Sequence, residues 1–243
     1  MGQVPYGLIG SGRAAKHLKY YFQLLGLEVE TWSRSTDSEI APDEKLSACR
    51  TVLLAISDRA LEPFIRRHPR LITKKLVHLS GGLYTSLAPS AHPLVAFGDV
   101  LFSPDFYPKI PFVWERGSSR FQDFFPELRN PHFEIEPTQK SLYHALCVFS
   151  GNFSTLLWQG AARQMHEKFD IPFEALVPYL DSVVGNLKHS PDTALTGPLA
   201  RRDHETLQRD LDALRDPATR QIFLSFINTY VPGPQESRRE ADL

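Results

Sequence analysis

A glycine-rich turn close to the N-terminus has the residue types and the spacing of a phosphate-binding loop. The turn, Gly10–Ala15, reads G-S-G-R-A-A and directly follows the apolar run Val4–Ile9. In a strand–turn–helix unit the first glycine permits a tight turn, and the second lets the backbone approach a pyrophosphate at the helix N-terminus. We therefore expect a dinucleotide to bind at Gly10, Ser11, Gly12, Arg13 and Ala14. The alternative is a glycine turn that packs a helix and binds nothing.

The residues after the second predicted strand indicate which dinucleotide is preferred. Sites that prefer NAD usually place Asp or Glu about 20 residues after the glycines, where the carboxylate binds the ribose 2′-hydroxyl. This chain has Ser33, Arg34 and Ser35 at that place. A guanidinium and two hydroxyls suit a 2′-phosphate, so the sequence predicts NADP as the cofactor. The alternative is that Arg34 is a solvated residue of the turn.

His144 is the leading candidate for acid–base chemistry. It stands in the first turns of a long helix predicted from Thr138 onward. An imidazole with a pKa near 6.5 can donate the proton that accompanies hydride delivery to a carbonyl or imine. Gly151 and Asn152 follow on roughly the same side of a regular helix, and the Asn152 amide can hold a substrate oxygen. A histidine that only packs in the core or at an interface is the alternative.

Further candidates stand at turns and strand ends. Thr196 begins a tight Thr-Gly-Pro segment between helices, and Arg201 follows a turn later. Their hydroxyl and guanidinium groups can orient an anionic substrate, although a structural turn that starts a helix is an equal alternative. Ser57, Ser80 and Gly81 follow the third and fourth predicted strands, where they either line the nicotinamide side or serve as loop and cap residues.

The elements that position these residues follow from the hydrophobic pattern. Alternating strands and helices with short connections predict an α/β fold with an open, Rossmann-type, mostly parallel sheet, followed by an all-α domain. The predicted domains are an NADP-binding domain (1–135), a helical substrate or dimerisation domain (136–232) and a disordered tail (233–243). The predicted strands are Val4–Ile9, Leu27–Trp32, Thr51–Ile56, Lys75–Leu79, Pro93–Phe97 and Ile110–Trp114.

Composition excludes several classes of function. The chain has 243 residues, with 27 Lys+Arg against 28 Asp+Glu, so its surface offers no strong field for nucleic acid or anionic membranes. Its 2 cysteines lie far apart, which excludes a disulfide framework and favours a reducing, cytoplasmic compartment. We expect no metal site, no membrane span and no export segment, because none of the corresponding patterns is present.

Several motifs follow one another in a familiar order along essentially the whole chain. They are the glycine turn, Ser57-Asp58, Ser80-Gly81, His92-Pro93-Leu94, Tyr143-His144 with Asn152, and Ala194–Pro198 with Arg201 and Asp203. Together they resemble a bacterial family of Rossmann-like proteins with a C-terminal helical domain of unknown function, whose members are often labelled NADP oxidoreductases. That family is similar to pyrroline-5-carboxylate reductase, ketopantoate reductase, 6-phosphogluconate dehydrogenase and the deazaflavin-dependent NADP reductases.

From the candidate residues above we expect an NADP-dependent oxidoreductase that transfers a hydride between nicotinamide and a small polar, anionic carbonyl or imine substrate. The resemblance itself implies the fold and the NADP cofactor. It also implies a homodimer that pairs through the helical domains. Related dehydrogenases often use a lysine on the helix that enters the second domain. The nearest candidates here are Lys140 and His144, so the lysine mechanism does not carry over. This departure keeps open a different class, a non-catalytic NADP-binding regulatory or scaffold protein.

Overall fold

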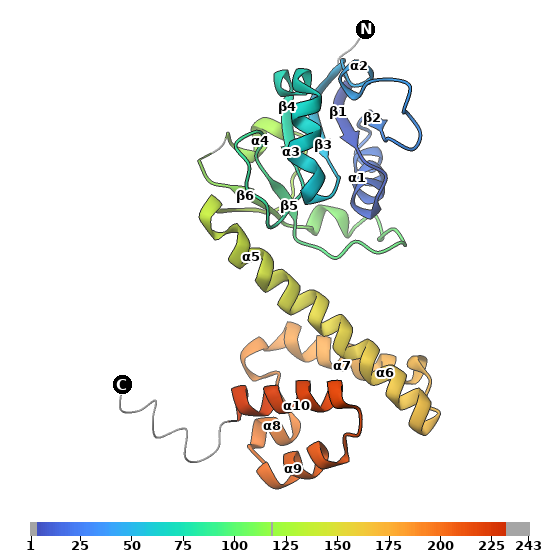
Figure 1. Cartoon of the computed structure of the whole chain (residues 1–243), viewed down its shortest axis with the longest axis vertical. Helices are drawn as coiled ribbons and strands as arrows, with labels where there is room; N and C mark the ends of the chain where they lie inside the picture. The colour runs from blue at the N-terminus through green and yellow to red at the C-terminus, as the bar shows by residue number, and fades with distance from the viewer. Residues whose placement is uncertain (1–3, 118, 232–243) are drawn as a thin grey trace. The chain divides into compact units, whose positions relative to one another are not determined.

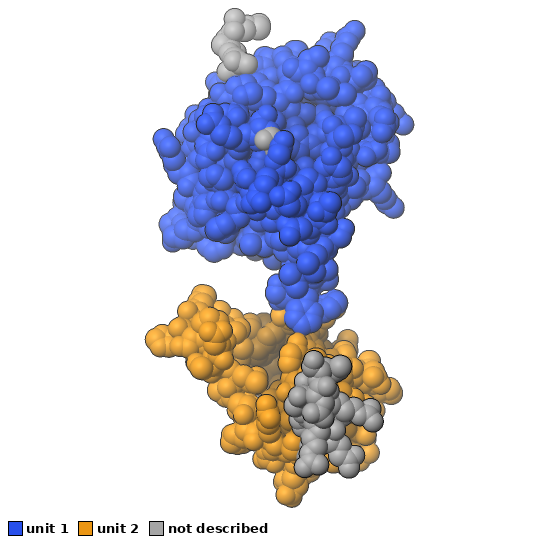
Figure 2. Space-filling model, turned by 90° about the vertical axis from the view of Figure 1, so that its left-hand side faces the viewer, with its two compact units in different colours: residues 1–153 blue, residues 154–243 orange. Residues whose placement is uncertain are grey.

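The computed structural model describes residues 4–117 and 119–231 of the chain. Contacts divide the chain into two units, residues 1–153 and residues 154–243, which Figure 2 draws in different colours. The sequence predicts a domain boundary at 135/136. The first unit extends further because Lys140 and Tyr143, on the next helix, contact its strand residues Glu115 and His92. The predicted tail 233–243 lies outside the described residues.

Four parallel strands form the main sheet of the first unit, in the order β2-β1-β3-β4 (Figure 1). The register pairs Ile9 at the end of β1 with Trp32 of β2 and with Leu54 of β3, so these strands end at one edge of the sheet. The predicted Rossmann-type parallel sheet is therefore confirmed. The four strands are β1 (Val4–Ile9), β2 (Val29–Trp32), β3 (Cys49–Leu54) and β4 (Lys75–His78).

Side chains of the main sheet alternate between two apolar cores, one for each face. Leu8 and Leu53 belong to a core that includes one side of helix α1 (Arg13–Leu24). Leu54, the next residue of β3, belongs to a second core with helix α3 (Asp58–Arg67). Strands covered by helices on both faces are apolar throughout, which explains the uninterrupted apolar run in the third predicted strand.

A smaller sheet has the order β5-β6-β7, and here the structure differs from the prediction in two respects. β5 (Ala91–Pro93) is antiparallel to β6 (Phe112–Glu115), and β7 (His132–Ile135), which the sequence analysis missed, is parallel to β6. The connection from β5 to β6 contains only the short 3-10 turn Tyr107–Lys109. A parallel pair needs a long crossover, usually a helix, whereas an antiparallel pair does not.

Short helices complete the first unit, and its last helix continues without a break toward the second. After α5 (Lys140–Cys147) the residues Val148–Phe153 form a π-helical stretch, in which a turn takes more residues than in an α-helix. The other short elements are α2 (Pro42–Lys45), α4 (Phe121–Phe124) and the 3-10 turns Pro69–Thr73 and Pro137–Gln139.

In residues 154–231, the described part of the second unit, every regular element is helical, as predicted. Asp203 caps α9 by accepting a hydrogen bond of 3.1 Å from the Thr206 amide. No helix among the described residues is long and apolar enough to cross a membrane. The helices are α6 (Ser154–Phe169), α7 (Phe173–His189), α8 (Gly197–Arg201), α9 (His204–Ala213) and α10 (Pro217–Tyr230), with the 3-10 turn Pro191–Thr193.

Candidate functional site

The glycine turn depends on one close approach of two backbone segments. Gly10 has a φ of +125°, and a Cβ there would stand 2.3 Å from the carbonyl oxygen of Ala55. The Gly10 amide also donates to the carbonyl of Trp32 at 2.9 Å, which ties the turn to β2. Only glycine fits at this position. Gly12, at the N-cap of α1, has no atom within 4 Å of where its Cβ would be, so the space above it is open.

A cavity of about 680 Å³ opens at the carboxyl ends of β1, β2 and β3. In parallel α/β sheets this is where ligands bind. Six residues that the sequence analysis assigned to the cofactor line this one cavity: Gly10, Ser11, Ser33, Arg34, Ser35 and Ser57. The structure therefore brings together the glycine turn, the loop after β2 and the start of α3.

Helix α3 supplies a wall of this cavity that the sequence analysis missed. Ala60, Phe64 and Arg67 all line it. Their spacing of four and three residues places them on one helix face. The sequence spacing was therefore enough to place these three residues on one helix face. Nothing in the sequence alone indicated that this face lies toward the glycine turn. Pro63 and His68 complete the wall.

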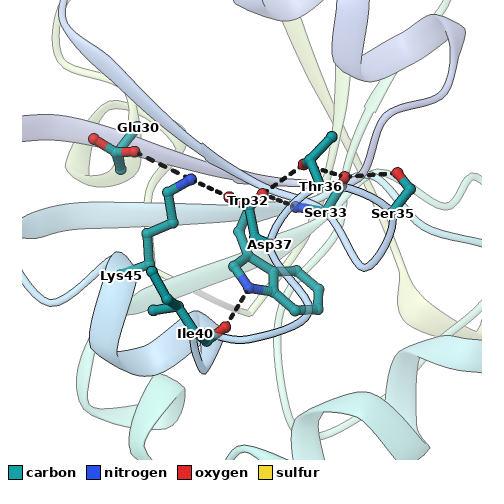
Figure 3. Close-up of polar contacts among 8 residues, drawn as sticks. All are labelled: Glu30, Trp32, Ser33, Ser35, Thr36, Asp37, Ile40 and Lys45. Carbon is teal, nitrogen blue, oxygen red and sulfur yellow. Dashed lines mark hydrogen bonds and ion pairs between the residues drawn. The ribbon is translucent and has the colours of Figure 1, made fainter.

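The loop after β2 is held in shape by Asp37 (Figure 3). The Asp37 carboxylate accepts hydrogen bonds from the Ser33 amide at 2.9 Å and the Thr36 hydroxyl at 2.7 Å, and it pairs with Lys45. The hydrogen bond from Lys45 lowers the pKa of Asp37 to about 2. The carboxylate of Asp37 is therefore occupied by Ser33, Thr36 and Lys45.

The serine hydroxyls and Arg34 differ in their surroundings. Ser33 is 8% exposed, and its hydroxyl shares hydrogen bonds with Ser35 at 3.0 Å and Thr36 at 2.8 Å (Figure 3). Arg34 is exposed, and in the described part of the chain its guanidinium has neither an ion pair nor a hydrogen bond. Arg34 is therefore the group of this loop whose charge is open to a ligand, and Ser33 mainly stabilises the loop.

The start of α1 contains the remaining predicted phosphate-binding residues, Gly12, Arg13 and Ala14. Arg13 does not line the cavity but forms a two-point ion pair with Asp99, with distances of 2.8 and 3.2 Å. Both side chains are exposed, so the pair contributes little to stability and can exchange partners. Arg13 thus follows the glycine turn, and its guanidinium is paired with the Asp99 carboxylate.

A second group of polar side chains surrounds Ser80 and Gly81, which follow β4. The Ser80 hydroxyl donates to the Asp58 carboxylate at 2.7 Å. Asp58 is the first residue of α3, and Ser57 occupies the N-cap. The Asp58 carboxylate links α3 to the segment after β4.

His92 and Tyr143 form a hydrogen-bonded pair in this group. The Nδ1 atom of His92 and the Tyr143 hydroxyl are 2.7 Å apart, and the two rings are nearly perpendicular, at 79°. Burial lowers the pKa of His92 to about 4, so the imidazole is neutral at pH 7. Burial also raises the pKa of Tyr143, which keeps its proton. The pair is thus two neutral groups that can share and pass on a proton.

His144 lies against the glycine pair Gly81-Gly82. A Cβ on Gly81 would stand 3.1 Å from ring atoms of both His144 and His92, and one on Gly82 would stand 3.3 Å from His144. Side chains at these two positions would push the imidazoles away. His144 itself is exposed on the first turns of α5, as the sequence analysis expected.

Lys140 is held in the same group by a buried ion pair. Its ammonium is 2.9 Å from the Glu115 carboxylate and 3.3 Å from the Ser80 carbonyl oxygen, and its side chain is 3% exposed. Burial lowers the pKa of Lys140, an effect that the Glu115 carboxylate opposes. The pair fixes the first turn of α5 to β6. With its ammonium buried and paired, Lys140 is not in the position of an accessible catalytic lysine.

The other predicted substrate-binding residues lie further along the chain. Asn152 is exposed in the π-helical stretch. The prediction that it shares a side with His144 assumed a regular α-helix, and the wider π-helical turn removes that regular spacing. Thr196 is the N-cap of α8 and Arg201 its last residue, both exposed in the second unit. Among the described residues no group of His, Cys, Asp and Glu has the arrangement of a metal site.

Comparisons with known proteins match this architecture. Residues 115–228 match the family model described as a domain of unknown function, DUF2520. A comparison with curated protein sequences found no match. Among solved structures, a Bacteroides fragilis protein to which NADP oxidoreductase activity is ascribed is 20% identical over 95% of this chain and 99% of its own, with a TM-score of 0.75.

Two further solved structures are similar over nearly their whole length. Protein TM1727 from Thermotoga maritima is 20% identical over 96% of this chain and 99% of its own, with a TM-score of 0.68. An imine reductase from Myxococcus stipitatus, solved with NADP⁺, is 15% identical over 93% and 94% of the two chains, with a TM-score of 0.57. The chain therefore has the Rossmann-type fold with a C-terminal helical region that its sequence resemblance implies, and residues 115–228 match the domain of unknown function DUF2520.

Proposed function

We propose that this protein is an NADP(H)-dependent oxidoreductase. The observation that carries the proposal is the single cavity of about 680 Å³ lined by both the glycine turn and Arg34. It lies at the carboxyl ends of parallel strands, where this fold binds dinucleotides. The Bacteroides fragilis and Myxococcus stipitatus proteins, whose descriptions name NADP, support this choice of cofactor.

The residues present fit such a cofactor. The open space at Gly12 and the N-terminus of α1 suit a pyrophosphate. Arg34 has no acidic partner among the described residues and suits a 2′-phosphate, and Asp37, which could repel that phosphate, is paired with Lys45. Ser57 lines the same cavity, and we propose that it lies toward the nicotinamide end with Ser80 and Gly81.

When bound, NADPH supplies a hydride to the carbon of a carbonyl or imine. We place the reacting end near Ser80, because Ser57 lines the cavity and the next residue, Asp58, binds the Ser80 hydroxyl. His144 then donates the proton to the substrate oxygen or nitrogen. The buried His92–Tyr143 pair stands beside it as a neutral relay that can replace this proton.

The substrate we propose is a small polar molecule with an anionic group. Asn152 would hold its reacting oxygen, and Thr196 with Arg201 would bind the anionic end. These three roles are predictions from the sequence. All three residues are exposed, which such roles require.

The cofactor proposal is tested by replacing Arg34 with alanine. A lost charge-assisted contact of about 1.5–3 kcal/mol corresponds to about ten- to a hundredfold weaker NADP⁺ binding. Isothermal titration calorimetry with NADP⁺ and NAD⁺ measures the change. Equal binding of the two dinucleotides by the unmodified protein would refute the preference for NADP.

The reaction is tested by following NADPH absorbance with a panel of oxo acids and cyclic imines. We expect His144→Ala to abolish turnover on any active substrate and to leave NADP⁺ binding unchanged, since His144 does not line the cofactor cavity. Tight NADPH binding without oxidation across a broad panel would favour the non-catalytic alternative instead.

We also propose a homodimer formed through the helical unit. Only Leu176, Leu207, Leu211 and Val231 are buried apolar residues among the described residues of this unit. A helical unit of this size needs a larger apolar core to be stable alone. A cytoplasmic location is proposed as well, since both cysteines are free thiols.

A further inference from the structure

Arg67, at the end of α3, is a second arginine on the cavity that Arg34 lines. Both are exposed, and neither has an ion pair or a side-chain hydrogen bond within residues 4–117 and 119–231. Two other arginines near Arg67 in the sequence do have acidic partners. Arg66 is 3.2 Å from Glu62, and Arg70 is 3.9 Å from Asp43. Two guanidinium groups without acidic partners on one cavity suit a ligand group with more than one negative charge.

Aromatic contacts fix the end of α3 against β2. The ring of Phe64 is 5.6 Å from that of Trp32 and 4.7 Å from that of His68, measured between centroids. The Trp32 indole in turn donates to the Ile40 carbonyl at 2.8 Å, which ties it to the loop that follows β2 (Figure 3). Arg67 stands between Phe64 and His68 on this helix turn. Its backbone is therefore held at a fixed place relative to the loop that contains Arg34.

Two carboxylates near this end of the cavity, Asp37 and Asp43, are already paired. Asp37 is occupied by Lys45, and Asp43 lies 3.7 Å from His68 as well as near Arg70. The two unpaired arginines therefore add positive charge that these two carboxylates do not neutralise. An anion at this place meets positive charge from two different elements, the loop after β2 and α3.

We infer that Arg67 binds the 2′-phosphate of NADP together with Arg34, so that the phosphate lies between one guanidinium from the loop and one from α3. The inference rests on the proposed function and adds a specificity-determining residue to it. This role would explain why Arg67, at the end of α3 that lines the cavity, has no acidic partner among the described residues. It also predicts that Arg34→Ala alone leaves part of the preference for NADP.

The test replaces Arg67 with alanine and measures binding by calorimetry at low ionic strength. The probes are NADP⁺, NAD⁺ and adenosine 2′,5′-bisphosphate, which carries the 2′-phosphate without nicotinamide. We expect NADP⁺ and the bisphosphate to bind about tenfold more weakly, with Arg67→Lys retaining part of the affinity and NAD⁺ changing less than about twofold. Arg66→Ala is the matched control, because Arg66 is the preceding residue but is paired with Glu62; its binding should equal that of the unmodified protein.

Two results would overturn the inference while the proposed function stands. One is NADP⁺ binding by Arg67→Ala that is as tight as in the unmodified protein. The other is an equal loss of binding affinity for NAD⁺ and NADP⁺ in Arg67→Ala, which would mean that Arg67 contacts a part of the cofactor common to both dinucleotides. If the unmodified protein binds neither NADP⁺ nor the bisphosphate, the proposed function itself fails, and the inference with it.

Discussion

At the scale of single residues, three histidines near the end of β4 differ because their surroundings differ. His78 is fully buried, and its Nδ1 atom accepts a hydrogen bond of 3.2 Å from the Ser80 amide. His92 is partly buried and bonded to Tyr143, whereas His144 is exposed. Of the three, only His144 is accessible to a substrate from solvent, whereas His78 packs inside the fold.

Two of these histidines, His78 and His92, make the stability of the protein dependent on pH. Burial lowers the pKa of His78 to about 3 and that of His92 to about 4. In the unfolded chain both have a pKa near 6.5, so the unfolded state binds more protons below that pH. The native state therefore has its full stability above about pH 6.5 and loses it as the pH falls toward 4. At pH 5 the loss from His78 alone is about 2 kcal/mol.

Urea unfolding at pH 7 and pH 5 measures this loss. We expect His78→Asn to be less stable than the unmodified protein at pH 7 but to lose less stability between the two pH values. The exposed His189 provides the control, since His189→Asn should keep the full pH dependence. An unchanged dependence in His78→Asn would contradict the assignment.

At the scale of elements, the glycine turn combines two glycines with different tasks. Gly10 is required for folding, because its φ is positive and its missing Cβ leaves room for the Ala55 carbonyl. Gly12 has ordinary backbone angles and open space around it, so the fold does not require a glycine there. The missing side chain of Gly12 keeps this space open, as a bound pyrophosphate would need.

This difference predicts opposite results for two alanine substitutions. Gly10→Ala should lower the free energy of unfolding by at least about 2 kcal/mol, because it adds backbone strain and a clash. Gly12→Ala should change stability by less than about 1 kcal/mol, yet weaken NADP⁺ binding. Chemical unfolding and calorimetry on the two variants give the comparison. Unchanged NADP⁺ affinity in Gly12→Ala would remove the glycine turn from the phosphate site.

At the scale of the whole molecule, the two units differ in how much apolar surface they bury. The first unit has two cores that cover both faces of its main sheet. The second unit exposes large apolar residues along several helices, among them Leu156 on α6, Tyr179 on α7 and Phe226 on α10. This difference is the physical basis for the proposed dimer, because a partner would bury what the single chain leaves exposed.

A dimer makes thermal stability depend on protein concentration. We expect the Tm to rise with concentration and Phe226→Asp to abolish this rise and to yield a monomer in light scattering. Val100→Asp is the control, because Val100 is 81% exposed but is a single apolar residue on a loop of the first unit. A constant Tm together with a monomeric mass for the unmodified protein would refute the dimer.

The sequence by itself determined the local parts of this protein. The strand–glycine–helix unit could be predicted because the chemistry of the turn involves residues only a few positions apart, and Arg34 follows β2 directly. The parallel sheet and the helical C-terminal region could be predicted because apolar periodicity reports burial along one element. The bounds of several strands differ from the prediction; the strand expected at Pro93–Phe97, for example, is Ala91–Pro93. The antiparallel pairing of β5 and the strand β7 were not predicted, since pairing between strands depends on the connections between them and not on the local sequence pattern.

Only the tertiary structure decided which distant residues meet. Arg67 lines the cavity with Arg34 because Phe64 and Trp32 pack α3 against β2, and no local pattern encodes that contact. The pairs Lys140–Glu115 and His92–Tyr143 likewise join residues 25 and 51 positions apart. A side chain's neighbours across the fold follow from the packing of whole elements, so the charge, burial and partners of such groups become known only once that packing is known.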